Sequence, residues 1–384
     1  MVISDGRSGK TRSPWQRHRK RCLSGRLIVT AVALRDYRSY AKLDLELEPG
    51  LVLVTGPNGA GKTNLLESLH VGTQGFSPRT RADAQLVRFG REAARVALHG
   101  DRTGVPLDLE VVLQLGSGKR ATLNGARLRA AEQLRGEVTT LVFTPDRLVV
   151  VKGGPAARRA YFDRVLGRLT PARSGLSAEY GAAVGQRNAA LRRVAQGVST
   201  RDALAPWNEQ VSRLGAELVA GRHAVVAALQ PSFAERAEEL GLLQAELRYE
   251  GEPPTAAELE NRVDRDLERG ATSLGPHLDD LGVLSAGRDL RTFGSQGEQR
   301  LAVLALLLGE AELLQEQRGT RPLLLLDDVL SELDSHRRNV LAERLRAGGQ
   351  ALVTSASRGA LPGEPTQLLE VAQREDGTSE VQAA

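Results

Sequence analysis

The feature that most limits the possible folds of this chain is the glycine-rich octapeptide Gly-Pro-Asn-Gly-Ala-Gly-Lys-Thr at residues 56–63. It directly follows the apolar run 51–55 and precedes an amphipathic segment with Leu65, Leu66 and Leu69 on one helical face. Glycines let backbone N–H groups turn inward around an anion, and the start of a helix adds partial positive charge there. This context predicts a phosphate-binding loop between a strand and a helix.

We expect this loop to hold the phosphates of ATP. The Lys62 ammonium would reach the β and γ phosphates, and the Thr63 hydroxyl would be a ligand of Mg²⁺. Lysine is rare in this chain, so a chance match to the pattern is improbable. The residues predicted to bind ATP are Gly56, Pro57, Asn58, Gly59, Ala60, Gly61, Lys62 and Thr63.

A buried strand that ends in two carboxylates is predicted at residues 322–328, Pro-Leu-Leu-Leu-Leu-Asp-Asp. Four consecutive leucines indicate a strand covered on both faces. Asp327 would join Thr63 in holding Mg²⁺, and Asp328 would polarise the attacking water as a general base. Such a strand can also simply end in solvated acids, but the phosphate-binding loop favours chemistry. We therefore predict Lys62, Asp327 and Asp328 as the catalytic residues.

A third motif, Ser-Gln-Gly-Glu-Gln at residues 295–299, precedes the apolar segment 301–308. Ser295 and the glutamate three positions later form a capping box, so one interpretation is only a well-started helix. The motif is also similar to the signature of ABC-type ATPases, and residues 331–334 resemble their D-loop. In that family the signature of one subunit contacts the γ phosphate of ATP held by a second subunit. The resemblance implies that Ser295, Gly297, Gln299 and Asp334 contact the partner subunit's ATP.

Three features separate this chain from other ABC-type ATPases. Thr354 or Ser355 stands where transporter ATPases usually place a switch histidine. The 233 residues from Lys62 to Ser295 are too many for the usual transporter domain and far too few for the arms of chromosome-maintenance heads. The segment 144–146 replaces the usual Q-loop glutamine, which leaves open the side chain that completes the Mg²⁺ shell.

Further segments resemble the RecF family of ABC-type ATPases, over about residues 27 to 358. These segments are residues 34–40 (LRDYRSY), 143–148 (FTPDRL), 152–155 (KGGP), 158–159 (RR) and 274–280 (LGPHLDD). The resemblance implies an α/β fold: an ABC-type P-loop ATPase head, with a mixed sheet around the P-loop helix. It also implies an inserted, mainly helical subdomain and no long coiled coil.

The same resemblance implies a role in recombinational repair, replication and the SOS response. It implies an ATP-dependent homodimer with Mg²⁺ that clamps DNA at single-strand gaps or duplex/single-strand junctions, without reading bases. With RecR and RecO it would promote RecA loading, and its weak ATPase activity would be stimulated by DNA. The single cysteine, Cys22, fits a reducing cytoplasm, and the resemblance implies association with the nucleoid. We expect no membrane partner, since no run of eighteen apolar residues occurs.

The charge is uneven along the chain, whose formal net charge is +5. Residues 1–26 carry eight Arg or Lys and one acid, whereas the other 358 residues hold 44 basic and 46 acidic groups. The basic segment is interpreted either as a disordered extension or as a DNA-binding arm. The predicted organisation is an extension at 1–26, the first part of the ATPase domain at 27–155, a helical insertion at 156–245 and the second ATPase part at 246–384.

DNA contacts cannot be assigned from the composition, because aromatic residues make up only 3% of the chain and the body has no net positive charge. Two arginine clusters are candidates for phosphate contacts, the alternative being solvated faces. They are Arg79, Arg81, Arg88 and Arg91, and Arg187, Arg192 and Arg193. His277 is either structural or close to the nucleotide. Two other functions stay open: an ABC-type ATPase with a non-DNA client, such as a transporter subunit or translation factor, and a module that holds ATP without hydrolysing it.

Overall fold

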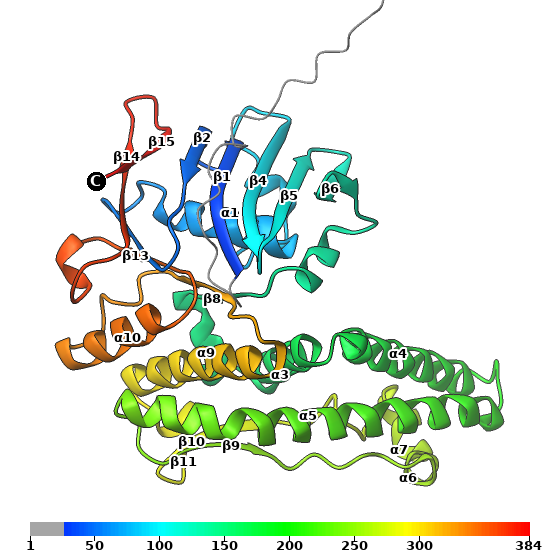
Figure 1. The fold of residues 1–384 in the computed structure, drawn as a ribbon. Helices are drawn as coiled ribbons and strands as arrows, with labels where there is room; N and C mark the ends of the chain where they lie inside the picture. Colours follow the sequence, from blue (N-terminus) through cyan, green and yellow to red (C-terminus); the bar gives the residue numbers. More distant parts are fainter. Residues whose placement is uncertain (1–26) are drawn as a thin grey trace, which may run out of the picture.

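The computed structural model describes residues 27–384, so the basic extension predicted for residues 1–26 lies outside the described residues. Figure 1 shows most of the β-strands gathered in one half of the molecule and the long helices packed side by side in the other. Within the described residues, no helix is both long and apolar enough to cross a bilayer.

A mixed six-stranded sheet forms the centre of the molecule. Its strands are β3 (Leu51–Thr55), β8 (Thr140–Phe143), β12 (Leu323–Leu326), β13 (Ala351–Ser355), β14 (Gln367–Gln373) and β15 (Ser379–Ala383). Their order is β15-β14-β3-β13-β12-β8, and only the β14–β15 pair is antiparallel. All four leucines of β12 are buried between β8 and β13, which confirms the predicted leucine strand.

The central strand β3 separates two apolar clusters. Leu51 and Leu53 belong to the cluster that the long helices cover, whereas Val52 and Val54 belong to the cluster on the opposite face. Successive side chains of a strand point to opposite faces, so an uninterrupted apolar run is required where both faces are covered. This burial holds the end of β3, and with it the loop that follows, in a fixed position.

An antiparallel sheet packs over the second of these clusters. Its strands are β1 (Leu27–Tyr37), β2 (Tyr40–Glu46), β4 (Ala93–Arg102), β5 (Val105–Gln114), β6 (Gly118–Leu123) and β7 (Ala126–Arg127), in the order β2-β1-β4-β5-β6-β7. Helix α1 (Lys62–Gln74) contacts both sheets, and its Leu65, Leu66 and Leu69 are buried as predicted. Two short 3-10 helices, η1 (Asp83–Leu86) and η2 (Ala131–Gly136), flank this sheet.

The other half of the molecule is mainly helical. Its helices are α2 (Val149–Lys152), α3 (Pro155–Leu169), α4 (Leu176–Ala195), α5 (Ala205–Glu239), α6 (Ala256–Asn261), α7 (Val263–Arg269), α8 (Leu290–Phe293) and α9 (Gln296–Arg318), and α10 (Ser335–Ala347) covers the central sheet. A small sheet joins β9 (Ala245–Tyr249), β10 (Leu281–Ser285) and β11 (Arg288–Asp289). The predicted helical insertion thus coincides with α3, α4 and α5, although its exact boundaries stay predictions.

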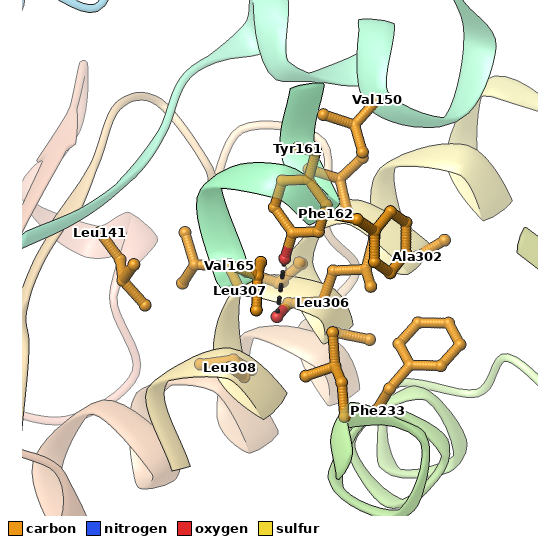
Figure 2. Packing of buried hydrophobic residues seen from close by; sticks show 14 of the residues in the cluster. Leu141, Val150, Tyr161, Phe162, Val165, Phe233, Ala302, Leu306, Leu307 and Leu308 are labelled. Atoms are coloured by element: carbon orange, nitrogen blue, oxygen red, sulfur yellow. Dashed lines mark hydrogen bonds between the residues drawn. The ribbon is translucent and has the colours of Figure 1, made fainter. Parts of the chain in front are cut away.

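Helices α5 and α9 cross at close range. A Cβ atom built on Gly309 of α9 would lie 2.9 Å from the backbone nitrogen of Phe233 in α5, so only glycine fits there. Figure 2 shows Phe233 and Leu306 at this crossing, with Tyr161 of α3 above them. The Tyr161 hydroxyl donates to the carbonyl of Leu306 (3.4 Å), which ties α3 to the signature helix α9.

Candidate ATP-binding and signature sites

The phosphate-binding loop adopts a backbone that only glycine tolerates at two positions. Gly56 has φ 143° and Gly61 has φ 115°. A Cβ atom at Gly56 would lie 2.1 Å from the carbonyl oxygen of Val371, and one at Gly61 would lie 2.3 Å from Oγ of Ser379. The loop is therefore pressed against β14 and β15, and its glycines fit the close packing as well as the turn.

Lys62 lies at the first position of α1 and folds back over the loop. Its ammonium donates to the carbonyl oxygens of Gly56 (2.7 Å) and Pro57 (2.8 Å). Desolvation lowers the pKa of Lys62, while the charges of Asp328 and Asp327 act in the opposite direction. The Lys62 ammonium thus lies beside the phosphate-binding loop and close to both predicted catalytic carboxylates.

Thr63 and Asp327, the two predicted Mg²⁺ ligands, are in contact. The Thr63 hydroxyl lies 3.0 and 2.9 Å from the two carboxylate oxygens of Asp327, which is only 8% exposed. A hydroxyl and a carboxylate are the hard oxygen donors that Mg²⁺ prefers, and this ion commonly takes only one or two protein ligands beside phosphates and waters. The residues present therefore fit Mg²⁺, and no larger group of ligating side chains is found among residues 27–384.

Asp328 differs from Asp327 in exposure and backbone conformation. It is exposed and has φ 50°, an uncommon value for a residue other than glycine. Its backbone N–H donates to the Thr354 hydroxyl (2.9 Å), and the same hydroxyl donates to the Asp327 carboxylate (2.7 Å). One buried side chain therefore fixes both acids. Such strained residues are concentrated at functional sites.

Thr354 is a site residue to which the sequence analysis assigns no role. The sequence places either Thr354 or Ser355 at the position of the transporter switch histidine. β13 lies between β3 and β12 in the sheet, so the end of β13 faces the ends of both motif strands. The departure from the transporter pattern at that position was the available signal.

Two further contacts brace the loop from outside. The Tyr40 hydroxyl donates to the carbonyl of Gly61 (3.1 Å), and Ser379 Oγ donates to the carbonyl of Ala60 (2.5 Å). Tyr40 belongs to one of the segments that resemble the RecF family, so the sequence points to it as a residue of interest. Ser379 lies beyond the part of the chain that the resemblance covers, and no sequence pattern points to it.

The Q-loop position is occupied by a buried residue. Thr144 follows β8 and is buried, while the carbonyl of the preceding Phe143 accepts the backbone N–H of Asp327 (2.9 Å). This segment therefore lies beside the end of β12. Among residues 27–384, the side chains that donate to the Asp327 carboxylate are the hydroxyls of Thr63 and Thr354, and the Thr144 hydroxyl is not one of them.

The signature lies at the N-terminus of α9. Ser295 is the N-cap: its hydroxyl accepts from the N–H of Glu298 (3.2 Å), and its own N–H donates to the Glu298 carboxylate (2.8 Å). The predicted capping box is thereby confirmed. Ser295 and Gly297 are exposed, and within residues 27–384 no hydrogen bond joins them to the phosphate-binding loop. Asp334 is also accessible, as the N-cap of α10.

Gln299 does not fit the role predicted for it. Only 5% of it is exposed, and its amide donates to the carbonyls of Leu290 (2.8 Å) and Gly294 (3.2 Å). It fixes the segment that leads into α9 and is not available to the ATP of a partner subunit. The neighbouring Arg300 forms an ion pair with Glu332 of the predicted D-loop, which links the signature helix to residues beyond β12.

Two other expectations are settled by burial. Arg187 is fully buried and pairs with Asp266 (2.6 Å), so it cannot contact DNA, although Arg192 and Arg193 are exposed. His277 accepts from the Tyr180 hydroxyl (2.8 Å) and donates to a backbone carbonyl (3.1 Å). Desolvation lowers its pKa. These contacts lie within the helical half, so His277 has a structural role.

The mixed sheet, the P-loop helix between two sheets and the signature helix, whose N-terminal start is exposed, are those of an ABC-type P-loop ATPase head. Comparison with known proteins extends this result. The family model for the RecF/RecN/SMC N terminal domain matches residues 28–380. The head domain of an Smc protein from Pyrococcus furiosus has the same fold, with a TM-score of 0.57 and 17% identity over 93% of this chain and 96% of that chain.

More similar proteins carry the name "DNA replication and repair protein RecF". The protein from Acidothermus cellulolyticus is 39% identical over 86% of this chain and 94% of its own length, and the protein from Symbiobacterium thermophilum is 38% identical over 85% and 91%. A solved structure of the recombination mediator protein RecF with ATP superposes with a TM-score of 0.83, at 27% identity over 95% of this chain and all of that chain. The chain belongs to the RecF family.

Proposed function

We propose that this chain is an ATP-dependent, DNA-binding clamp of recombinational repair that hydrolyses ATP slowly between two copies of itself. The observation that carries the proposal is the contact of the Thr63 hydroxyl with the Asp327 carboxylate at 2.9 Å. It joins a phosphate-binding loop to a strand-end acid, the combination that a nucleoside triphosphatase with Mg²⁺ requires.

The proposed chemistry assigns one task to each residue. The loop backbone and Lys62 hold the β and γ phosphates, and Thr63 and Asp327 hold Mg²⁺, which neutralises the charge on the phosphate oxygens. Asp328 accepts a proton from the water that attacks the γ phosphorus. The bond from that phosphorus to the bridging oxygen breaks, and ADP and phosphate leave. The exposure of Asp328 supports this role, since a bound water can reach its carboxylate.

The second half of the site would come from another copy of the chain. Ser295, Gly297 and Asp334 are accessible, and the Ser295 hydroxyl and the Gly297 N–H would contact the γ phosphate bound by the partner. ADP lacks this phosphate. ATP should therefore favour the dimer and ADP the monomer, because a ligand stabilises the state that binds it.

The DNA role rests on the relatives. They are named DNA replication and repair proteins, and the solved relatives belong to the RecFOR pathway. On this ground we propose that the clamp recognises single-strand gaps or junctions on nucleoid DNA. We further propose that it works with RecR and RecO to promote RecA loading, and that DNA stimulates its ATPase activity. Contacts to the phosphate backbone, together with recognition of the shape of the junction, would be sufficient for this binding, because it requires no reading of bases.

DNA-binding assays on gapped, duplex and single-stranded DNA, each with ATP, ADP or no nucleotide, test the proposal directly. We expect binding only with ATP, tightest on gapped DNA, and a DNA-dependent rise in ATP hydrolysis. Equal, nucleotide-independent affinity for all three DNAs would exclude the clamp. Turnover of ATP without any DNA binding would favour an ATPase with a different client, and tight ATP binding without turnover would favour a non-hydrolysing module.

A further inference from the structure

The edge of the antiparallel sheet forms a basic surface pocket. Strands β6 and β7 and the start of η2 enclose a cavity of about 400 Å³, whose charged lining residues are Lys119, Arg120, Arg127 and Arg129. None of its lining residues is acidic or aromatic. We call this cavity the basic pocket.

Two arginines of the basic pocket have no partner within the part of the chain that the structure describes. Arg127 and Arg129 are exposed, and their guanidinium groups make no ion pair or hydrogen bond with residues 27–384. Arg120 has only one weak contact, to Gln114 (3.4 Å). The Lys119 ammonium is neutralised by Glu132 (2.7 Å) and Asp83 (3.7 Å). The pocket therefore keeps an uncompensated positive charge that comes from arginines.

Two backbone N–H groups at the basic pocket already have hydrogen-bond acceptors. The N–H groups of Arg129 and Ala130, at the start of η2, already donate to the Gln133 side chain (2.9 and 3.3 Å). An anion in the basic pocket would be held by guanidinium groups. Their planar, forked donors match phosphate oxygens well.

The basic pocket lies near one of the arginine clusters found in the sequence, because Lys119 pairs with Asp83 of η1. Of the two arginines that lead into η1, Arg81 is exposed, but Arg79 pairs with Glu67 of α1 (3.4 Å). Arg88 and Arg91, beyond η1, are by contrast paired with Asp36 (3.5 and 3.4 Å). In the basic pocket and this cluster, the exposed arginines without an ion pair to residues 27–384 are therefore Arg81, Arg120, Arg127 and Arg129.

We propose that the basic pocket is where this chain holds the phosphate backbone of duplex DNA, an inference that rests on the DNA-binding function proposed above. The net charge of residues 27–384 supports a local DNA-binding site. These residues hold slightly more acidic than basic groups, so without a local basic site they would repel a polyanion. The pocket has no aromatic side chain on which bases could stack, which favours a contact with phosphates that is independent of sequence.

The test is the double variant Arg127→Glu/Arg129→Glu, measured by fluorescence anisotropy on labelled duplex and gapped DNA with ATP. Both residues are exposed and lie outside the ATP site, so we expect unchanged ATP binding, hydrolysis without DNA and ATP-driven dimerisation. The DNA affinity should fall at least about tenfold, and the slope of log affinity against log salt between about 50 and 200 mM should become less steep by about two. The matched control is Arg192→Glu/Arg193→Glu on α4, which makes the same charge change at two exposed arginines and should keep most of the affinity.

Three results would overturn the inference, and they can be told apart. If the parent protein does not bind DNA with ATP, the proposed function fails and the inference with it. If the parent binds DNA and the Arg127/Arg129 variant binds equally well, only the basic pocket is refuted. If calorimetry shows that the pocket binds inorganic phosphate or pyrophosphate while both variants keep parental DNA affinity, its ligand is a free phosphate compound.

Discussion

The phosphate-binding loop and the signature are both proposed to contact the phosphates of ATP, but they differ in how many of their contacts come from the same chain. In the loop, Lys62 and Thr63 are each bonded to groups of the same chain, and Asp327 and Asp328 are oriented by Thr354. At the signature, the bonds of Ser295 are local to the first turn of α9, and Gly297 faces outward.

This difference supports the proposal that one chain binds a nucleotide but needs a second copy to complete the site. The loop is braced by two strands and two hydroxyl groups, so it is preorganised in the single chain. The signature is equally well formed, because the capping box fixes its helix start, but its Ser295 and Gly297 are exposed to solvent. The variants below therefore should separate into those that affect binding or chemistry and those that affect association.

The largest effect is expected for Asp328→Asn. Removing the general base should lower kcat about a hundredfold to ten-thousandfold, with ATP affinity changed little. The ATP-bound dimer should persist, because the signature is untouched. Single-turnover hydrolysis and light scattering measure both properties. Glu343→Gln, the same change at an exposed carboxylate on α10, is the control and should behave as the parent. A parental rate in Asp328→Asn would refute the assignment of the base.

The next largest effect is expected on dimerisation, and it tests the signature. Ser295→Arg removes the hydroxyl and places a bulky side chain where the partner's nucleotide would dock, and this steric clash should weaken ATP-driven dimerisation about a hundredfold or more. ATP binding to the monomer should be unchanged, and DNA binding should fall with the dimer. Ser117→Arg, in the exposed turn between β5 and β6, adds the same charge elsewhere and should dimerise normally.

Analytical centrifugation measures the mass of the parent and of both serine variants in ATP, in ADP and without nucleotide, and so shows whether each protein dimerises. An ATP-induced dimer in Ser295→Arg, or a parent whose mass never changes, would mean that the site is not shared between two chains.

A smaller effect is expected for Lys62→Met. The loss of a charge-assisted bond to phosphate, about 1.5–3 kcal/mol, should weaken ATP binding about tenfold to a hundredfold. Titration calorimetry measures this directly. Lys42→Met removes a mostly exposed lysine of β2 and should leave the affinity as it is. Normal ATP binding by Lys62→Met would contradict the role of the loop.

The parts of the site that the sequence predicts are those encoded by contiguous residues. The loop at 56–63 and the strand at 323–326 are each formed by one short continuous segment, so the local sequence pattern is sufficient to predict their structure. Thr354 and Ser379 reach the same site only through the strand order of the central sheet, in which β13 separates β3 from β12. No local pattern encodes that order.

Two errors have different physical causes. Gln299 has the spacing of a signature residue, but its side-chain amide donates to carbonyls of α8 and of the turn that follows α8. These carbonyls lie outside the motif, so the motif could not reveal them. Arg187 could have been excluded from the sequence itself. It lies one helical turn from the apolar positions Val184 and Leu191, on the buried face of α4, whereas Arg192 and Arg193 lie on the exposed face.

The smallest effect is expected for Thr354→Val, which tests whether the nucleotide half of the molecule depends on the hydroxyl that joins its two acids. Valine keeps the shape of the buried threonine but cannot donate to Asp327 or accept from the N–H of Asp328. Lost hydrogen bonds of this kind cost about 1–3 kcal/mol each when a partner stays buried and unsatisfied.

We expect Thr354→Val to lower the hydrolysis rate about tenfold or less and to raise the Mg²⁺ concentration needed for half-maximal activity, because both effects follow from a less well-oriented Asp327. ATP-driven dimerisation should be unchanged, since the signature lies on α9. Thr354→Ser restores the hydroxyl and should restore the rate, and Ser355→Ala, one residue further along β13, should be neutral. A loss of dimerisation in Thr354→Val with a parental rate would instead show that this threonine serves the association of the two chains, and that the two halves of the site are less independent than their contacts indicate.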